Sequence, residues 1–350
     1  MPTRDGRVGF GIIGLGFGLS RCLMFKDAPE AQLVAVASRT EAKAGAAGEQ
    51  FGVDWYTDYR RMLDREDVDV VGIYTPSGAH LEIACDVAAA GKHVLVTKPL
   101  EITLERADGI MEACQSAGVK LATEFVTRYL PANFTLYQAV QDRQLGEMIL
   151  GEFSEKLYRP AWYFEMDGGW RSTWGLGGGG TVMNQTIHSL DQMRWIMGEV
   201  QWLTASTGNF ASPAESEDTA VASVKFRSGA LGVLVGTTTF RNDRPTGRYG
   251  GGSIRRAEVN GDRGSATVVD GDFQMWAVNG QTEPPAGITP PAANIFQDMA
   301  RWVRDETYRS PTLADGPDSR RTLELVLAVY ESARAGRTVA LGDQETRRSS

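Results

Sequence analysis

Cysteine, histidine and long apolar runs are all scarce in this 350-residue chain. Its three cysteines, Cys22, Cys85 and Cys114, lie in helical patterns without the spacing of metal ligands, so we expect reduced core thiols, no zinc site and no disulfide framework. The sequence contains no stretch of ~20 apolar residues to span a bilayer, and its N-terminus is polar. We therefore expect a cytoplasmic protein without a membrane partner.

The chain also lacks a surplus of basic residues. Its formal net charge is -8, and its lysines and arginines form no long run, which argues against a nucleic-acid surface. The composition is otherwise that of a globular protein. A chain of 350 residues more often folds as two domains than as one.

The apolar runs that are present change character along the chain. Up to about residue 125 they alternate with helical patterns, at 33–38, 69–75, 93–98 and 119–125, which predicts a doubly wound α/β domain over 1–125. After residue 126, strand patterns follow one another at 146–158, 218–226, 230–240, 256–261 and 265–269. They predict an α+β domain over 126–342 with a largely antiparallel, open-faced sheet, closed by helices near 290–306 and 317–335. Residues 343–350 are expected to form a tail.

Two overlapping glycine patterns lie near the N-terminus. Gly9-x-Gly11-x-x-Gly14 fits the dinucleotide fingerprint, whereas Gly14-x-Gly16-x-x-Leu19 lacks its last glycine. A fingerprint needs a buried strand before its turn and a helix after it, and only the second pattern follows an apolar run. We therefore predict a nucleotide site on the second pattern, with a doubtful helix position at Leu19. Its turn residues are Gly14, Leu15, Gly16 and Phe17.

Polar residues follow the other predicted strands of the first domain. In doubly wound sheets, ligands bind outside the carboxyl ends of the strands. Ser38 and Arg39 offer a hydroxyl and a guanidinium that suit a 2′-phosphate, so NADP(H) is the first expectation and NAD(H) remains open. The alternative is that Thr40 caps the next helix and Arg39 is only solvated. Lys98 follows a strand and precedes Pro99, a position from which it could exchange a proton with a substrate hydroxyl.

The segment 168–198 contains one of only three histidines in the chain. If a helix begins by Asn184, then Asn184, His188, Asp191 and Trp195 share one polar face that could line a pocket. Glycines 177–180 would let the backbone approach a ligand, or they form a flexible connector. His93 is expected to be structural, and His80 lies at a helix start after Pro76.

These motifs, in their order and spacing, resemble the Gfo/Idh/MocA oxidoreductase family over nearly the whole chain. The series comprises GLGFG, TPSGAH, AGKHVLVTKP, Arg128-Tyr129 after a strand, and WR...GGGG...NQxxHxxD. The resemblance implies a sugar or polyol dehydrogenase in which Lys98 and His188 handle the hydroxyl proton. Asn184 stands where many members have aspartate, which favours a substrate hydrogen bond over a base. Thr97 replaces the family's usual glutamate before the lysine.

The resemblance also supplies the remaining expected contacts. Arg171 matches an arginine near the cofactor, and Thr75, Pro76 and His80 match the loop beside the nicotinamide. Arg128 and Trp170 are expected to contact the substrate, although Trp162, Tyr163, Trp170 and Trp174 equally suit a core or a dimer contact. Family members often pair through their open sheets, so a homodimer or homotetramer is expected.

The sequence leaves three functions open for this protein. The first is hydride transfer between NAD(P) and a hydroxyl-bearing carbon of a sugar, polyol or sugar derivative, including a sugar-nucleotide acid. The second is an NAD(P)-dependent glycoside hydrolase that oxidises its sugar transiently and eliminates the aglycone. The third, a cofactor-sensing regulator without turnover, is disfavoured by the presence of both Lys98 and His188.

Overall fold

A computed structural model describes residues 6–242 and 250–342 of the chain. The contacts divide the chain into two compact units. The first unit comprises Met1–Tyr129 and Pro290–Arg321, and the second comprises Leu130–Thr289 and Thr322–Ser350. The boundary expected at 125/126 compares with a division of the contacts after Tyr129, and the segment Pro290–Arg321 belongs to the first unit, which a linear division of the sequence does not predict.

The first unit contains a seven-stranded sheet in the order β14-β6-β5-β4-β1-β2-β3. Its strands pair in parallel except β14, which runs antiparallel to β6. The strand order reverses between β1 and β4. From β1 the chain adds β2 and β3 on one side, and it then returns to add β4, β5 and β6 on the other, as in doubly wound folds. The strands are β1 (Val8–Ile13), β2 (Ala31–Ala37), β3 (Asp54–Tyr56), β4 (Val70–Ile73), β5 (His93–Thr97), β6 (Leu121–Glu124) and β14 (Ala314–Asp315).

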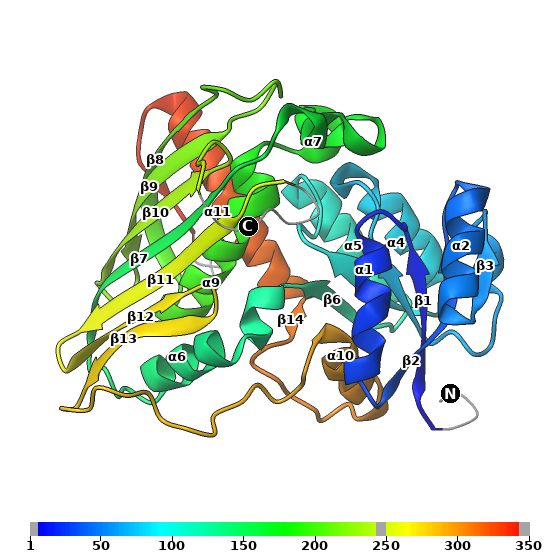
Figure 1. Ribbon diagram of the computed structural model, residues 1–350, viewed down its shortest axis with the longest axis horizontal. Helices are drawn as coiled ribbons and strands as arrows, with labels where there is room; N and C mark the ends of the chain where they lie inside the picture. Colours follow the sequence, from blue (N-terminus) through cyan, green and yellow to red (C-terminus); the bar gives the residue numbers. More distant parts are fainter. Residues whose placement is uncertain (1–5, 243–249, 343–350) are drawn as a thin grey trace. The chain divides into compact units, whose positions relative to one another are not determined.

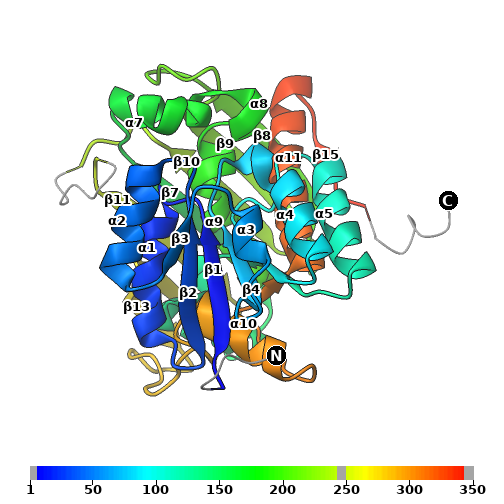
Figure 2. The same ribbon diagram turned by 90° about the vertical axis from the view of Figure 1, so that its right-hand side faces the viewer.

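Helices cover both faces of this sheet. Figure 2 shows α1 and α2 on one side of the strands and α4 and α5 on the other. The returning helix α10 (Ile295–Arg304) packs on β1 and β2, where Phe296 meets Phe10 and Phe25 in the core. The other helices are α1 (Gly18–Cys22), η1 (Leu23–Asp27), α2 (Glu41–Phe51), α3 (Arg60–Leu63), η2 (Ser77–Ala79), α4 (His80–Ala89), α5 (Leu104–Ser116) and η3 (Val126–Tyr129).

The second unit contains an eight-stranded sheet in the order β13-β12-β11-β7-β10-β9-β8-β15. Only β7 and β10 pair in parallel among these described strands, so the sheet is largely antiparallel, as predicted. Its strands are β7 (Met148–Leu157), β8 (Val200–Gly208), β9 (Thr219–Phe226), β10 (Leu231–Thr237), β11 (Ser253–Gly261), β12 (Gly264–Val269), β13 (Asp272–Val278) and β15 (Val339–Ala340).

One face of this sheet packs against helices (Figure 1), with α9 against β7 and β11 and α6 against β12. On the other face the side chains of Leu150, Val221 and Leu231 are exposed, which agrees with an open-faced sheet. The helices are α6 (Pro131–Gln141), α7 (Ala161–Glu165), η4 (Met166–Gly168), η5 (Trp170–Ser172), α8 (Trp174–Gly177), the π-helical turn η6 (Val182–Thr186) and α9 (Ile187–Met197). Helix α11 (Gly316–Ala335) begins in the first unit and continues in the second.

The cysteines and the helix lengths bear on two of the expectations from the sequence. Burial raises the pKa of the Cys22 and Cys114 thiols to about 12, so both are protonated core groups. Within residues 6–242 and 250–342, every helix is too short or too polar to cross a membrane. The expected tail at 343–350 lies outside the described residues.

Candidate active site

The glycine turn follows a strand that is buried throughout. Gly9 and Gly11 lie inside β1, and the chain turns at Gly14, directly after the strand ends. Gly14 has φ +93°, and a Cβ there would lie 2.5 Å from the carbonyl oxygen of Tyr74. Only glycine fits this position, because both the backbone conformation and the space exclude a side chain. The second glycine pattern is therefore the one at a strand-to-helix turn, and the cradle fits a dinucleotide.

The doubtful position at Leu19 is resolved by its neighbour Gly18, the first residue of α1. A Cβ on Gly18 would lie 3.0 Å from Cβ of Tyr74 and 3.2 Å from Cγ2 of Ile12, so this glycine permits the close approach of helix and strand. Leu19 packs against the hydrophobic core instead. The fingerprint spacing requires its third glycine at position 19, so it does not predict the role of Gly18, which lies one residue earlier.

The end of β2 carries the residues predicted to face the adenosine ribose. The Ser38 amide donates to the carbonyl of Tyr56 at 3.0 Å, and the Ser38 hydroxyl accepts the amide N–H of Thr40 at 3.4 Å. Thr40 makes no side-chain cap to α2, contrary to the alternative considered above. Arg39 is exposed. The guanidinium is thus available to a ligand at this edge.

His80 connects two loops at the ends of β4 and β5. Its side chain is fully buried; Nδ1 lies 3.1 Å from the carbonyl oxygen of Pro99, and Nε2 lies 3.2 Å from that of Thr75. Burial lowers the pKa of the imidazole. The expectation that His80 contacts the cofactor is not supported, because its ring is enclosed by backbone carbonyls. It instead orders the Thr75–Pro76 loop against the loop that carries Lys98.

Lys98 is half-buried at the end of β5, beside a buried carboxylate. Thr97 and Glu124 are register partners on β5 and β6, and the charge of Lys98 acts on the Glu124 carboxyl. Glu124 is 1% exposed, and Nε of Arg21 lies 2.9 and 3.0 Å from its two oxygens. Burial raises the pKa of Glu124, while the charges of Arg21 and Lys98 lower it.

This ion pair links three parts of the first unit. Arg21 belongs to α1, directly after the glycine turn, and its guanidinium lies 4.1 Å from the ring centroid of Phe17 in that turn. Glu124 places a carboxylate on the strand opposite Thr97, the residue that replaces the family's usual glutamate. Glu124 is absent from the site residues predicted above, because its position opposite Thr97 depends on strand register.

In the second unit, two polar side chains stand out along the segment 181–197. Asn184 and His188 are partly exposed, whereas the other residues from Thr181 to Arg194 are buried. The predicted polar face is partly wrong. Asp191 is fully buried and accepts a hydrogen bond from the Thr322 hydroxyl at 3.0 Å. Trp195 stacks on Tyr137 at 4.2 Å.

Within α9, Asp191 faces α11, where Thr322 lies, and helical spacing does not predict this tertiary contact. Asn184 lies just before α9, in the π-helical turn η6. Such turns occur frequently at functional sites.

The four glycines before this turn are fixed by the protein itself. A Cβ on Gly179 would clash with the Tyr330 hydroxyl, and one on Gly180 would clash with the Glu217 backbone. The Glu217 carboxylate accepts the amide N–H groups of Gly180 at 3.0 Å and Val182 at 2.9 Å. Gly179 and Gly180 therefore let the chain pack closely against Tyr330 and Glu217 and do not form a flexible connector.

The remaining predicted contacts have partners in the structure. Arg128 is 1% exposed and pairs with Asp318 at 2.7 Å, a structural ion pair within the first unit. Arg171 pairs with Asp167 at 3.3 Å, and its guanidinium lies 4.5 Å from the ring centroid of the half-buried Trp170. These contacts do not support a direct substrate role for Arg128.

The parallel sheet, its glycine turn and the antiparallel second unit define the architecture of a nicotinamide-dependent oxidoreductase. Two family models match the chain: "Oxidoreductase family, NAD-binding Rossmann fold" over residues 8–125 and "GFO/IDH/MocA C-terminal domain" over residues 134–267. The chain belongs to the Gfo/Idh/MocA family, as the motifs indicated, and is an NAD(P)-dependent oxidoreductase.

Several characterised proteins are similar over nearly their whole length. D-apiose dehydrogenase of Paraburkholderia graminis is 28% identical, with 95% of this chain and 90% of the relative covered. Myo-inositol 2-dehydrogenase of Thermotoga maritima is 27% identical, with 95% and 98% covered. The crystal structure of the WlbA dehydrogenase of Chromobacterium violaceum with NADH and UDP-GlcNAcA superposes with TM-score 0.84 at 28% identity, covering 97% and 98%. The relatives favour the oxidoreductase over the glycoside hydrolase.

Proposed function

We propose that this oxidoreductase transfers a hydride between a carbinol carbon of a sugar or polyol and the nicotinamide of NAD(P). The observation that carries the proposal is the selective exposure of Asn184 and His188 on a helical segment that is otherwise buried from 181 to 194. A bound nicotinamide supplies the hydride chemistry, and the chain supplies orientation and proton transfer. The two named dehydrogenases among the relatives act on apiose and inositol, which fits such a substrate.

Lys98 and His188 share one proposed role, movement of the hydroxyl proton, whereas Asn184 and Glu124 have others. Lys98 exchanges the proton of the reacting hydroxyl through its ammonium group, and His188 exchanges it through its imidazole. The Asn184 carboxamide cannot act as a base near neutral pH, so it orients the substrate by hydrogen bonds. Glu124 is a positioning residue, because it acts on the substrate only through the charge and placement of Lys98.

Substitution of the two proton-handling residues tests this assignment. Lys98→Met and His188→Asn should each lower kcat by about 10²–10⁴-fold, the usual contribution of a general acid or base, while NADH still binds. Lys43→Met, an exposed lysine on α2, is the matched control and should keep full activity. Full turnover in both active-site variants would contradict the proposal, and aglycone release without net cofactor reduction would favour the glycoside hydrolase.

We further propose that NADP(H) is the preferred cofactor. The segment from Ser38 to Thr40 contains no acidic residue for the ribose hydroxyls, and the exposed Arg39 guanidinium suits a 2′-phosphate. Calorimetric titration of cofactor-stripped protein should show tighter binding of NADPH than of NADH. Arg39→Ser should weaken NADPH by about tenfold and leave NADH unchanged. Equal or tighter binding of NADH to the unaltered protein would overturn the preference.

A homodimer through the open sheet face is the proposed assembly. Exposed apolar side chains lie on three adjacent strands of this face: Leu150 on β7, Leu231 and Val233 on β10, and Val221 on β9. An apolar patch of this kind marks an interaction surface. The cytoplasmic location expected from the sequence stays a prediction.

A further inference from the structure

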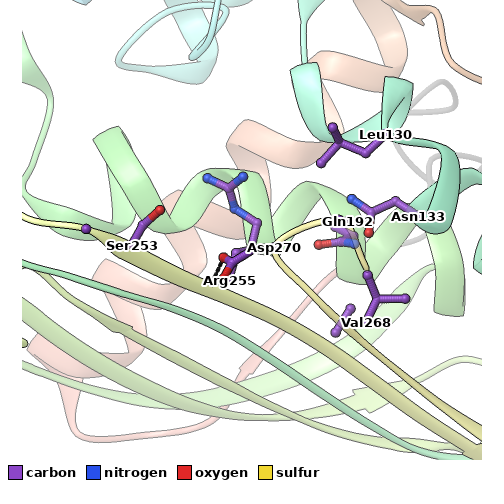
Figure 3. Close-up of a pocket in the computed structure, with 10 residues that line it drawn as sticks. Leu130, Asn133, Gln192, Ser253, Arg255, Val268 and Asp270 are labelled. Carbon is purple, nitrogen blue, oxygen red and sulfur yellow. Dashed lines mark hydrogen bonds between the residues drawn. The ribbon is translucent and has the colours of Figure 1, made fainter. Parts of the chain in front are cut away.

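A cavity of about 320 Å³ lies within the second unit, between the helices and the sheet. Figure 3 shows its walls. Asn133 comes from α6, Gln192 from α9, and Ser253 and Arg255 from β11, while Asp270 follows β12. Leu130, Ala257 and Val268 add apolar surface, and Gly252 and Gly271 complete the lining.

The charges around this cavity disfavour an anionic ligand. The Arg255 guanidinium forms a bidentate pair with Glu155, through Nε at 3.1 Å and Nη2 at 2.6 Å. The exposed Asp270 carboxylate accepts the Arg255 backbone N–H at 2.7 Å. The Glu155 carboxylate thus neutralises the guanidinium, and the Asp270 carboxylate adds a second negative charge beside the Arg255 backbone. A phosphate or carboxylate entering here would meet no uncompensated positive charge among the lining residues.

The inner wall offers uncharged hydrogen-bonding groups instead. Asn133 and Gln192 are 2% and 1% exposed. The Oε1 atom of Gln192 is buried and has no hydrogen-bond partner among the described residues. A buried acceptor without a partner is destabilising, so a donor at the cavity wall would stabilise the site. Hydroxyl groups are donors of this kind, and the carbon skeleton of a sugar suits the neighbouring Leu130 and Val268.

The cavity also lies close to the proposed proton-handling side chain. Gln192 follows His188 by four residues on α9, which places both on one helix face about 6 Å apart along the axis at ~1.5 Å per residue. We infer that the cavity holds the uncharged, hydroxyl-bearing part of the substrate distal to its reacting carbon, and that it excludes a nucleoside diphosphate. This inference rests on the proposed function and deepens it.

The consequence is a choice between two substrate classes. The structural neighbour WlbA is seen with UDP-GlcNAcA, a nucleotide-linked sugar acid, whereas the D-apiose and myo-inositol dehydrogenases are named for uncharged substrates. The cavity assigns this chain to the uncharged class. Of the substrate classes expected from the sequence, the inference favours the uncharged sugars and polyols over the sugar-nucleotide acids.

Ligand binding to the full chain tests the inference without requiring turnover. Saturation-transfer NMR with myo-inositol should show binding to the unaltered protein. Gln192→Leu, which keeps the side-chain size but removes the amide, should weaken that binding at least about fivefold. Gln274→Leu, at an exposed position on β13, is the matched control and should bind as the unaltered protein does. Ala257→Leu fills the cavity and should abolish binding, and thermal melting confirms that each variant is folded.

UDP-glucuronic acid, tested alongside, should not bind at this site. Asp270→Asn removes one of the two carboxylates and should admit some of this anion. Binding of UDP-glucuronic acid that Gln192→Leu weakens would overturn the charge argument. Absence of polyol binding, or binding that is unchanged in Gln192→Leu and Ala257→Leu, would overturn the site. Polyol binding that depends on Gln192, in a protein that transfers no hydride, would support the cavity and contradict the proposed function.

Discussion

Replacing Glu124 by glutamine should change the pH dependence of catalysis rather than abolish it. Glutamine has nearly the same shape but no charge, so it removes the negative charge beside Lys98 and leaves the strand pairing intact. The charge of Lys98 lowers the pKa of the Glu124 carboxyl, so the carboxylate in turn favours the protonated lysine. Interactions of this kind typically shift a pKa by ~1–3 units, and one unit corresponds to about 1.4 kcal/mol. The near-complete burial of Glu124 limits solvent screening of this interaction.

The assay is the pH profile of kcat/KM in the direction of alcohol oxidation. Lys98 must lose its proton to accept one from the substrate, so without Glu124 the rising limb should move to lower pH by about one unit. The exchange variant Thr97→Glu/Glu124→Thr places the carboxylate on the neighbouring strand at the same register and should restore the profile. Glu30→Gln is the matched control, because Glu30 pairs with Arg301 elsewhere in this unit. An unchanged limb in Glu124→Gln would refute the reasoning.

Three further predictions follow from single contacts. Gly14→Ala should abolish NADH binding, since its Cβ would lie 2.5 Å from the Tyr74 carbonyl, whereas Gly52→Ala has open space and should still bind; fluorescence titration compares them. Burial lowers the pKa of His93 to about 4, so the unfolded chain protonates near 6.5 before the folded one does, and stability falls as pH falls through that window. His93→Gln should reduce this pH-dependent loss of unfolding free energy by at most about 3 kcal/mol, as measured by urea titrations at two pH values. Val233→Lys should shift the chain toward monomer in light scattering, and a monomeric unaltered protein would contradict the dimer.

The first unit was predictable because its signals are local. A strand buried on both faces reads as a continuous apolar run, and the polar residues after β2, β4 and β5 mark one edge of the sheet. The short and exposed β3 carries no such signal and was missed. The return of α10 to this unit depends on its packing with Phe10 and Phe25, which no local pattern encodes.

The site was predictable as a set of residue types but not in its supporting contacts. Lys98, Asn184 and His188 were found by motif, and their proposed roles remain to be tested. The burial of Asp191 follows from its contact with Thr322 of α11, which sequence periodicity does not detect. Glu124 and Glu217 act across long sequence separations, one through strand register and the other through hydrogen bonds to the glycine segment. Such contacts depend on tertiary packing and have no local sequence pattern.

The most direct test of the central claim is the fate of a deuterium label. Purified protein is incubated with NADP⁺ or NAD⁺ and a polyol or sugar deuterated at its carbinol carbons, such as deuterated myo-inositol or D-xylose, and the reduced cofactor is analysed by mass spectrometry. The account predicts deuterium in the reduced nicotinamide with the unaltered protein and its loss with Lys98→Met. Reduced cofactor without deuterium, or label transfer that is unaffected by Lys98→Met, would contradict it.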